Sequence, residues 1–217
     1  MDGKNEVCRP NGVSSLQNLE PVLSRLQFWN DVELRPPAEH MAVDRSLLET
    51  AVFPILRIYR WAAPCVTIGY FQDMAATAAV YPGLEVVRRW TGGGTVLHGQ
   101  DAPYSLIVPR GEPFVTLRPA DSYCLIHSLL AVALREAIPD LACAPQDAPK
   151  HSAACFENPV KGDLILGSRK IAGAAQRRTR RGLLHQGSVH LGGPEFPQAW
   201  IFAQALSATV EAFLSQS

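Results

Sequence analysis

The sequence lacks the features that would direct a chain to a membrane or to nucleic acid. Its formal net charge is zero, with 20 basic and 20 acidic residues, so no global basic field indicates binding to nucleic acid or to an anionic membrane. No apolar run approaches the roughly 20 residues that span a bilayer. The N-terminal sequence Met-Asp-Gly-Lys-Asn-Glu lacks the charged-then-apolar order of a signal peptide. We therefore expect a cytoplasmic protein that partners neither membrane nor nucleic acid.

The cysteines form no pattern typical of a disulfide framework or a zinc site. They are five, an odd number, and none stands in a Cys-x-x-Cys spacing, so we interpret them as reduced thiols. Cys65, Cys124 and Cys143 have apolar neighbours and are expected to be structural. No metal site is therefore expected, whereas a reduced thiol elsewhere in the chain is available as a nucleophile.

Length and composition indicate one domain. The chain has 217 residues, of which 47% are hydrophobic, and this is enough to bury a substantial core. Residues 1–25 combine polar residues with a short amphipathic piece, and we predict a flexible N-terminal lead-in there. A single domain is predicted over residues 26–217, without an internal repeat.

Strand and helix patterns together predict an α/β (α+β) fold. β-branched and aromatic residues concentrate in segments that we predict as strands, at residues 27–34, 56–61, 66–70, 84–90, 104–108, 168–175 and 183–190. Apolar residues recur at helical spacing over residues 39–51 and 121–137, and a closing helix is predicted over residues 195–214. Prolines predict a loop over residues 142–159.

A glycine-rich loop between two predicted strands is the most informative segment. It reads Arg88-Arg89-Trp90-Thr91-Gly92-Gly93-Gly94, and His98 follows it. Glycines can adopt positive φ and let backbone N–H groups approach an anion or a carbonyl closely, while the arginines supply charge and paired donors. The loop is therefore interpreted as a ligand-binding segment, with a plain glycine hairpin as the alternative.

A second segment places a lysine beside small residues. Residues 162–178 predict a hairpin whose second strand runs from Lys170 into Gly173 and Ala174. An ammonium in such a place can stabilise the oxyanion of a tetrahedral intermediate, hold a thiolate, or contact the phosphate of an acyl-adenylate. The alternative is a turn lysine in water.

Four segments, including these two, resemble the lipoate-protein ligase and octanoyltransferase family of the biotin/lipoate ligase superfamily. The other two lie at residues 61–72, with the run Pro-Cys-Val-Thr-Ile-Gly-Tyr-Phe-Gln, and at residues 183–188, Leu-Leu-His-Gln-Gly-Ser. The four occur in the family's order across residues 28–191. The resemblance implies a mixed β-sheet flanked by helices, with an acyl tunnel.

The resemblance also implies an activity in protein lipoylation. We expect an acyltransferase that moves an octanoyl or lipoyl group from acyl carrier protein, through a cysteine thioester, to a lysine of a lipoyl domain in a 2-oxoacid dehydrogenase or the glycine cleavage H protein. No tightly bound cofactor is expected. The alternatives are an ATP-dependent lipoate-protein ligase, using lipoate, ATP and Mg, and a non-catalytic binder of lipoyl domains. Biotin ligation fits less well, because the Thr-Gly-Gly-Gly loop resembles the lipoate branch.

Two catalytic residues follow from the resemblance to the Cys-Phe octanoyltransferase branch. Cys155, in a Cys-Phe pair ahead of the lysine hairpin, matches the acyl-carrying nucleophile, and a nearby cation such as Lys170 would favour its thiolate. Another branch places its nucleophile at the segment that here reads Leu184-His185-Gln186-Gly187, which has no cysteine. Transfer through that position is therefore not available, which leaves Cys155 or a mechanism without a covalent intermediate.

The remaining site residues are implied as substrate-binding groups. They are Arg88, Arg89, Gly92, Gly93, Gly94, His98, Asp163, Gly173, Ala174, Gln176, His185 and Gly187. His98 and His185 are candidates for ligand contact or proton handling, because histidine titrates near neutral pH. The basic run at residues 177–181 is interpreted as a solvated hairpin turn and not as a nucleic-acid site, with contact to an acidic carrier protein as the alternative. The short stretch after the last motif favours transfer without ATP, since adenylating members generally have a further C-terminal domain or a partner subunit.

Overall fold

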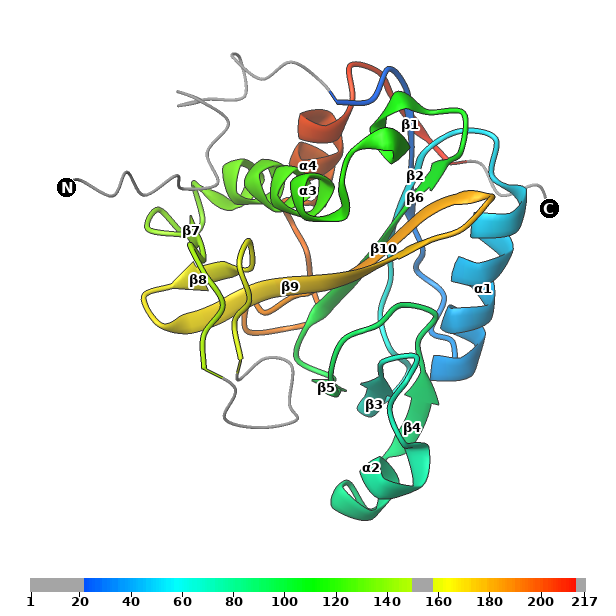
Figure 1. Cartoon of the computed structure of the whole chain (residues 1–217), viewed down its shortest axis with the longest axis vertical. Helices are drawn as coiled ribbons and strands as arrows, with labels where there is room; N and C mark the ends of the chain where they lie inside the picture. Colours follow the sequence, from blue (N-terminus) through cyan, green and yellow to red (C-terminus); the bar gives the residue numbers. More distant parts are fainter. Residues whose placement is uncertain (1–21, 150–157, 214–217) are drawn as a thin grey trace.

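A large mixed sheet forms the centre of the domain (Figure 1). The computed structural model describes residues 22–149 and 158–213. The eight strands of the large sheet lie in the order β11-β1-β2-β6-β10-β9-β8-β7. Their bounds are β1 Leu26–Asn30, β2 Ile55–Ile58, β6 Ala102–Pro109, β7 Ala142–Cys143, β8 Leu164–Leu166, β9 Arg169–Arg178, β10 Gly182–Val189 and β11 Val210–Ala212. The strands β11, β1 and β2 run parallel, and the pairs from β2 to β7 are antiparallel.

Helices cover both faces of this sheet. Successive side chains of a strand point to opposite faces, and β6 is buried on both: Leu106 and Val108 join the core that includes α3 (Pro119–Leu134) and α4 (Ala199–Leu206), whereas Ile107 packs with Leu48 of α1 (Pro37–Thr50). Figure 1 shows α1 on one side of the sheet and the α3–α4 pair on the other. None of the helices in the described residues is long and apolar enough to cross a membrane.

A smaller sheet stands beside the large one. It contains β3 (Cys65–Ile68), β4 (Glu85–Arg88) and β5 (Val96–His98) in the order β4-β3-β5. The short helix α2 (Met74–Val80) connects β3 to β4, and its first N–H groups are capped by the Asp73 carboxylate. In Figure 1 this sheet and α2 extend away from the body of the domain. The glycine loop lies between β4 and β5, as predicted.

The predicted helices at 39–51 and 121–137 are confirmed as α1 and α3, each of which begins with a proline at its first turn. The predicted closing helix at 195–214 is confirmed only over Ala199–Leu206, and its predicted C-terminal part is wrong. Helix α4 ends at Leu206, Ser207 takes an extended conformation, and β11 then adds to the sheet edge beside β1. The predicted loop at 142–159 also contains β7, which pairs with β8.

Leu23 precedes the predicted start of the domain at residue 26 and already packs in the core. Leu23 is 2% exposed and belongs to the main core, where its backbone bonds to that of Leu206 and Ala208. The extent of the domain beyond the described residues stays a prediction.

Candidate active site

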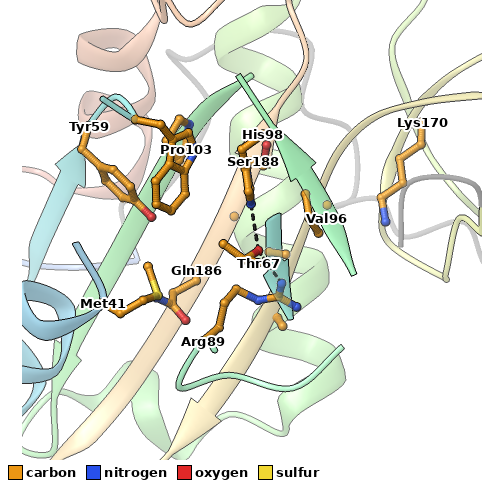
Figure 2. Close-up of a pocket in the computed structure, with 15 residues that line it drawn as sticks. Met41, Tyr59, Thr67, Arg89, Val96, His98, Pro103, Lys170, Gln186 and Ser188 are labelled. Atoms are coloured by element: carbon orange, nitrogen blue, oxygen red, sulfur yellow. Dashed lines mark hydrogen bonds between the residues drawn. The ribbon is translucent and has the colours of Figure 1, made fainter. Parts of the chain in front are cut away.

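A cavity lies between the large sheet and the small one. Its empty volume, including the open mouth, is about 480 Å³. Figure 2 shows its labelled side chains converging from both sheets and from α1. Its lining is largely apolar and consists of Met41, Tyr59, Trp61, Thr67, Arg89, Val96, His98, Pro103, Lys170, Gly173, Ala174, Ala175, Gln186, Gly187 and Ser188. A largely apolar concave lining with a few convergent polar groups is typical of a small-molecule site.

Lys170 is buried in this cavity and is not a turn residue in water. It is 6% exposed, and its Nζ lies 2.7 Å from Asp163 Oδ2. It stands near the start of β9, directly after the hairpin turn at Gly167, where φ is +60°. The sequence therefore placed this lysine correctly beside small residues, and the structure adds its carboxylate partner.

The Asp163 carboxylate is held by several donors. Besides Lys170, it accepts the backbone N–H of Val160 at 2.7 Å and the hydroxyl of Tyr123. The Tyr123 hydroxyl in turn accepts the N–H of Ala174 at 3.1 Å. These bonds fix the carboxylate against β9, and the carboxylate fixes the direction of the ammonium.

The arginines of the glycine loop bind protein carbonyls. Arg88 donates to the carbonyls of Gly69, Tyr70 and Gln72, and it does not line the cavity. Arg89 lines the cavity and donates to the Gly92 and Gly94 carbonyls at 2.9 Å each. Both side chains therefore hold the backbone around the loop in place.

One of the three loop glycines needs its conformational freedom. Gly93 has φ of +90°, whereas Gly92 and Gly94 are not among the positive-φ glycines. The Gly93 carbonyl packs against Gly69. A Cβ atom at position 69 would lie 2.0 Å from the Gly93 oxygen. The loop is thus fitted to the turn after β3, and Gly69 is as necessary to it as Gly93.

His98 belongs to a directed chain of hydrogen bonds on the cavity wall. Its Nδ1 lies 2.6 Å from Asp101 Oδ2, and its Nε2 lies 2.8 Å from Thr67 Oγ1. Burial alone would raise the pKa of Asp101, but hydrogen bonds from His98, Ser188 and the Gly99 N–H hold that pKa below its ordinary value. An ionised Asp101 accepts Nδ1–H, and in the neutral ring this leaves Nε2 to accept the Thr67 hydroxyl proton.

Arg89 completes this chain. It donates to Thr67 Oγ1 at 2.6 Å, which leaves the Thr67 hydroxyl hydrogen directed at His98. Figure 2 shows both bonds as dashed lines. The predicted residues Arg89 and His98 are therefore brought together through Thr67, at the cavity.

Gln186 forms the floor of the cavity with Met41. Its Nε2 donates to Asp44 Oδ2 at 2.8 Å, and its Oε1 accepts the Thr91 hydroxyl at 2.9 Å. Asp44 and Arg57 are both fully buried and form an ion pair, with 2.8 Å between Asp44 Oδ1 and Arg57 Nη1. A buried ionic cluster beneath α1 thus fixes the floor side chain.

His185 and Gln176 lie outside the cavity lining. His185 is fully buried, with Nε2 at 3.1 Å from the Tyr104 hydroxyl and Nδ1 at 3.1 Å from Gln176 Nε2. Burial lowers the pKa of His185 well below its ordinary value, so the ring is neutral. Gly187, by contrast, does line the cavity, and a Cβ there would meet the Tyr104 ring at 2.3 Å.

The sequence interpretation missed several lining residues. Thr67, Gln186 and Ser188 have ordinary polar side chains within strands, and Asp101 stands three residues after His98 in what reads as a turn. Strand alternation would not have found Gln186 and Ser188, because it places them on the opposite face of β10 from Gly187, whereas all three line the cavity.

The predicted nucleophile Cys155 lies outside the described residues, as does His151. Among the described cysteines, Cys65 is 1% exposed, and burial raises its pKa to about 12, so it is a structural thiol. Cys124 and Cys143 are half-buried. In the described part of the chain, no group of three or more His, Cys, Asp and Glu side chains is placed to hold a metal ion.

Comparison with known proteins decides the family. Residues 36–198 match the lipoyl protein ligase A/B catalytic domain. The chain belongs to this family. Octanoyltransferase LipM of Moorella thermoacetica is 33% identical over 173 residues, 74% of this chain and 63% of that protein. Octanoyltransferase LipM of Geobacillus kaustophilus is 35% identical over 173 residues, 72% of this chain and 62% of that protein. This lipoyl ligase-family chain thus spans a little under two thirds of their length.

Solved structures agree on the fold of this lipoyl ligase-family domain. A crystal structure of lipoate-protein ligase A bound with ATP has a TM-score of 0.60 and 22% identity, covering 76% of this chain and 66% of that one. Protein Ta0514 from T. acidophilum has a TM-score of 0.66 and 16% identity, covering 88% and 90%. At such identities the likeness shows the fold alone. The predicted family and the predicted mixed sheet flanked by helices are confirmed.

Proposed function

We propose that the chain is an octanoyltransferase of protein lipoylation, which moves an octanoyl or lipoyl group from acyl carrier protein to a lysine of a lipoyl domain. The observation that carries the proposal is the buried Lys170–Asp163 pair at a largely apolar cavity. The cavity offers an apolar wall to the acyl chain, and the ammonium offers a donor to its carbonyl. The name of the curated relatives, octanoyltransferase, supports the same activity.

Lys170 has the chemistry needed at the reacting carbonyl. A preorganised cation in a site that excludes water stabilises a developing oxyanion more strongly than water does. Asp163 orients the ammonium, and Gly173 leaves room for the side chain above the strand. Neither feature is required by a cavity that only binds a fatty chain.

The covalent mechanism depends on Cys155. In the first step its thiolate attacks the carbonyl carbon of the octanoyl thioester on the carrier, the C–S bond to the pantetheine arm breaks, and the departing thiolate takes up a proton. In the second step the amine of the lipoyl-domain lysine attacks the Cys155 thioester, loses a proton, and releases the thiol. Splitting the transfer in this way replaces one difficult aminolysis by two thioester steps.

The partners of the reaction are a carrier protein and a lipoyl domain. One structural neighbour is a bi-partite lipoate protein ligase from Thermoplasma acidophilum that is described with its E2 lipoyl domain, at a TM-score of 0.54 and 18% identity. From this neighbour we infer for this chain only the class of acceptor, a lipoyl domain. A cytoplasmic reaction fits the reduced thiol of Cys65, and the reaction as written needs no tightly bound cofactor.

Incubation with octanoyl acyl carrier protein and an apo lipoyl domain tests the proposal. Intact mass spectrometry of the lipoyl domain should show one octanoyl group added in the absence of ATP. If the acceptor gains mass only with free octanoate or lipoate, ATP and Mg, the chain is a ligase. If the acceptor binds but never gains mass under either condition, the chain is a lipoyl-domain binder.

A further inference from the structure

A row of aromatic and arginine side chains borders the glycine loop. Phe71 and Tyr70 meet edge-on with ring centroids 5.2 Å apart, and Arg177 stacks over the Tyr70 ring at 4.5 Å. Arg177 also lies 5.9 Å from the Trp90 ring, over which Arg45 stacks at 4.6 Å. We call these five side chains the Phe71 row. It joins the turn after β3, strand β9, the start of the glycine loop and helix α1.

The row is exposed to a degree that its own packing does not require. Phe71 is 91% exposed, Tyr70 is 36% exposed and the Arg45 side chain is 56% exposed. The apolar surface continues onto α2, where Met74 is 39% and Val80 is 69% exposed. Aromatic and arginine side chains are those most enriched in the energetic centres of protein interfaces, and contiguous apolar patches mark interaction sites.

The charge of this surface is positive. Arg45 and Arg177 belong to the row, and Arg88 lies beside it with its guanidinium on the Tyr70 carbonyl. Two carboxylates lie nearby: Glu49 pairs with Arg45 at 2.9 Å, and Asp73 caps helix α2. Three arginines against two carboxylates leave an excess of one positive charge. The surface therefore suits an acidic partner, since complementary charge sets the rate and register of docking.

Hydrogen bonds connect the Phe71 row to the cavity. The Tyr70 N–H donates to the Thr91 carbonyl at 2.9 Å, and Arg177 donates to the Trp90 carbonyl at 2.9 Å. Thr91 bonds directly to Gln186 on the cavity floor. A protein seated on the row would therefore lie against the glycine loop, whose Thr91 is bonded to the cavity floor.

We propose that the Phe71 row is the docking surface for the acidic acyl carrier protein that delivers the acyl group. The inference rests on the proposed function, because that function supplies a carrier with a prosthetic arm. Phe71 would bury its ring against the carrier, and Arg45 with Arg177 would face its carboxylates. The loop beneath the row would then lie where the arm enters the cavity.

Titration of holo acyl carrier protein into the full chain, followed by calorimetry, tests the inference. Phe71→Ser should weaken carrier binding about tenfold, and Arg45→Glu should weaken it and reduce its dependence on salt. Trp200→Ser and Arg118→Glu, which change exposed side chains on the α3–α4 side of the sheet, should leave the affinity unchanged. Thermal midpoints should confirm that all four variants fold.

Unchanged carrier affinity in both Phe71→Ser and Arg45→Glu would overturn the inference, as would the absence of any carrier binding to the unmodified chain. Loss of apo lipoyl-domain binding with carrier binding intact would also overturn it, by assigning the surface to the acceptor. The transfer assay is independent of these titrations. A chain that transfers octanoyl but binds carrier equally well in every variant keeps the proposed function and loses only this surface.

Discussion

Gly173 and the end of the Lys170 side chain share one space. A Cβ atom at position 173 would lie 2.2 Å from Cε and 2.5 Å from Nζ of Lys170. The same Cβ would lie 3.1 Å from Asp163 Oδ1. The glycine is therefore part of the geometry of the lysine, because any side chain there displaces the ammonium from its carboxylate.

Gly173→Ala should reduce octanoyl transfer with little loss of stability. The added methyl group meets the flexible end of a side chain, which can move, but a displacement of about 1 Å at a reacting group can cost about 10²-fold in rate. Steady-state kinetics and a thermal melt measure the two effects. Gly111→Ala is the matched control, because a Cβ at Gly111 meets nothing within 4 Å. Equal activity of the two variants would contradict this role of Gly173.

Lys170→Met should lower both activity and stability, because it leaves the Asp163 carboxylate buried without its cation. Breaking a buried pair from one side typically costs about 3–5 kcal/mol, and the two side chains here are 3% and 0% exposed. The double variant Lys170→Met with Asp163→Asn should regain much of the stability in urea denaturation. It should not regain activity. Recovery of turnover in the double variant would remove Lys170 from the mechanism.

Cys155 should carry the acyl group. Mixing the chain with octanoyl acyl carrier protein alone should add one octanoyl mass that hydroxylamine removes, since hydroxylamine cleaves thioesters. Cys155→Ser should lose the adduct and most turnover, whereas Cys124→Ser serves as the control. An unchanged rate in Cys155→Ser would falsify the covalent mechanism.

His127 should make the domain less stable in mild acid. Burial lowers the pKa of His127 to about 4, from an ordinary value of 6.5. Between these two values the unfolded chain binds a proton that the folded domain does not, so the free energy of unfolding decreases as the pH falls through this window. His127→Asn, whose amide N–H takes the place of Nδ1 and can still donate to the Gly162 carbonyl, should flatten that decrease.

Urea denaturation at a series of pH values measures the slope. Some slope should remain in the variant, because the pKa of His40 is also lowered to about 4, by burial and by the adjacent Arg57. Identical slopes with and without His127 would mean that its protonation does not differ between the folded and unfolded states.

The chemistry-bearing motifs were predictable because their residue types are rare in ordinary strands and turns. A lysine ahead of Gly-Ala-Ala, and three glycines after two arginines, indicate a site from sequence alone. The direction of each side chain was not predictable in the same way. Arg88 and Arg89 were expected to meet a ligand, and the structure shows that both donate to protein carbonyls.

The features that the sequence did not predict depend on partners far apart along the chain. Asp44 and Gln186 are 142 positions apart and bond to each other only because α1 packs on β10. Strand β11 likewise exists because its residues pair with β1, at the other end of the chain. Local propensity favoured a continued helix there, and the tertiary pairing overrode it.

Because of the buried ionic cluster, the two sides of the cavity differ in how easily they can be redesigned: the floor at Gln186 is fixed by the cluster, and Val96 of the small sheet is not. Arg57 is fully buried and bonds to Asp31, Asp44 and His40, and Asp44 holds Gln186. A change of size or charge on this floor leaves a partner unsatisfied, so it must be made together with others. Val96, on the small sheet, has an apolar side chain and leaves no polar partner unsatisfied when it is replaced. Altered acyl specificity is therefore most accessible, one substitution at a time, at Val96, whereas Thr67, Arg89 and His98 at the same sheet also hold partners.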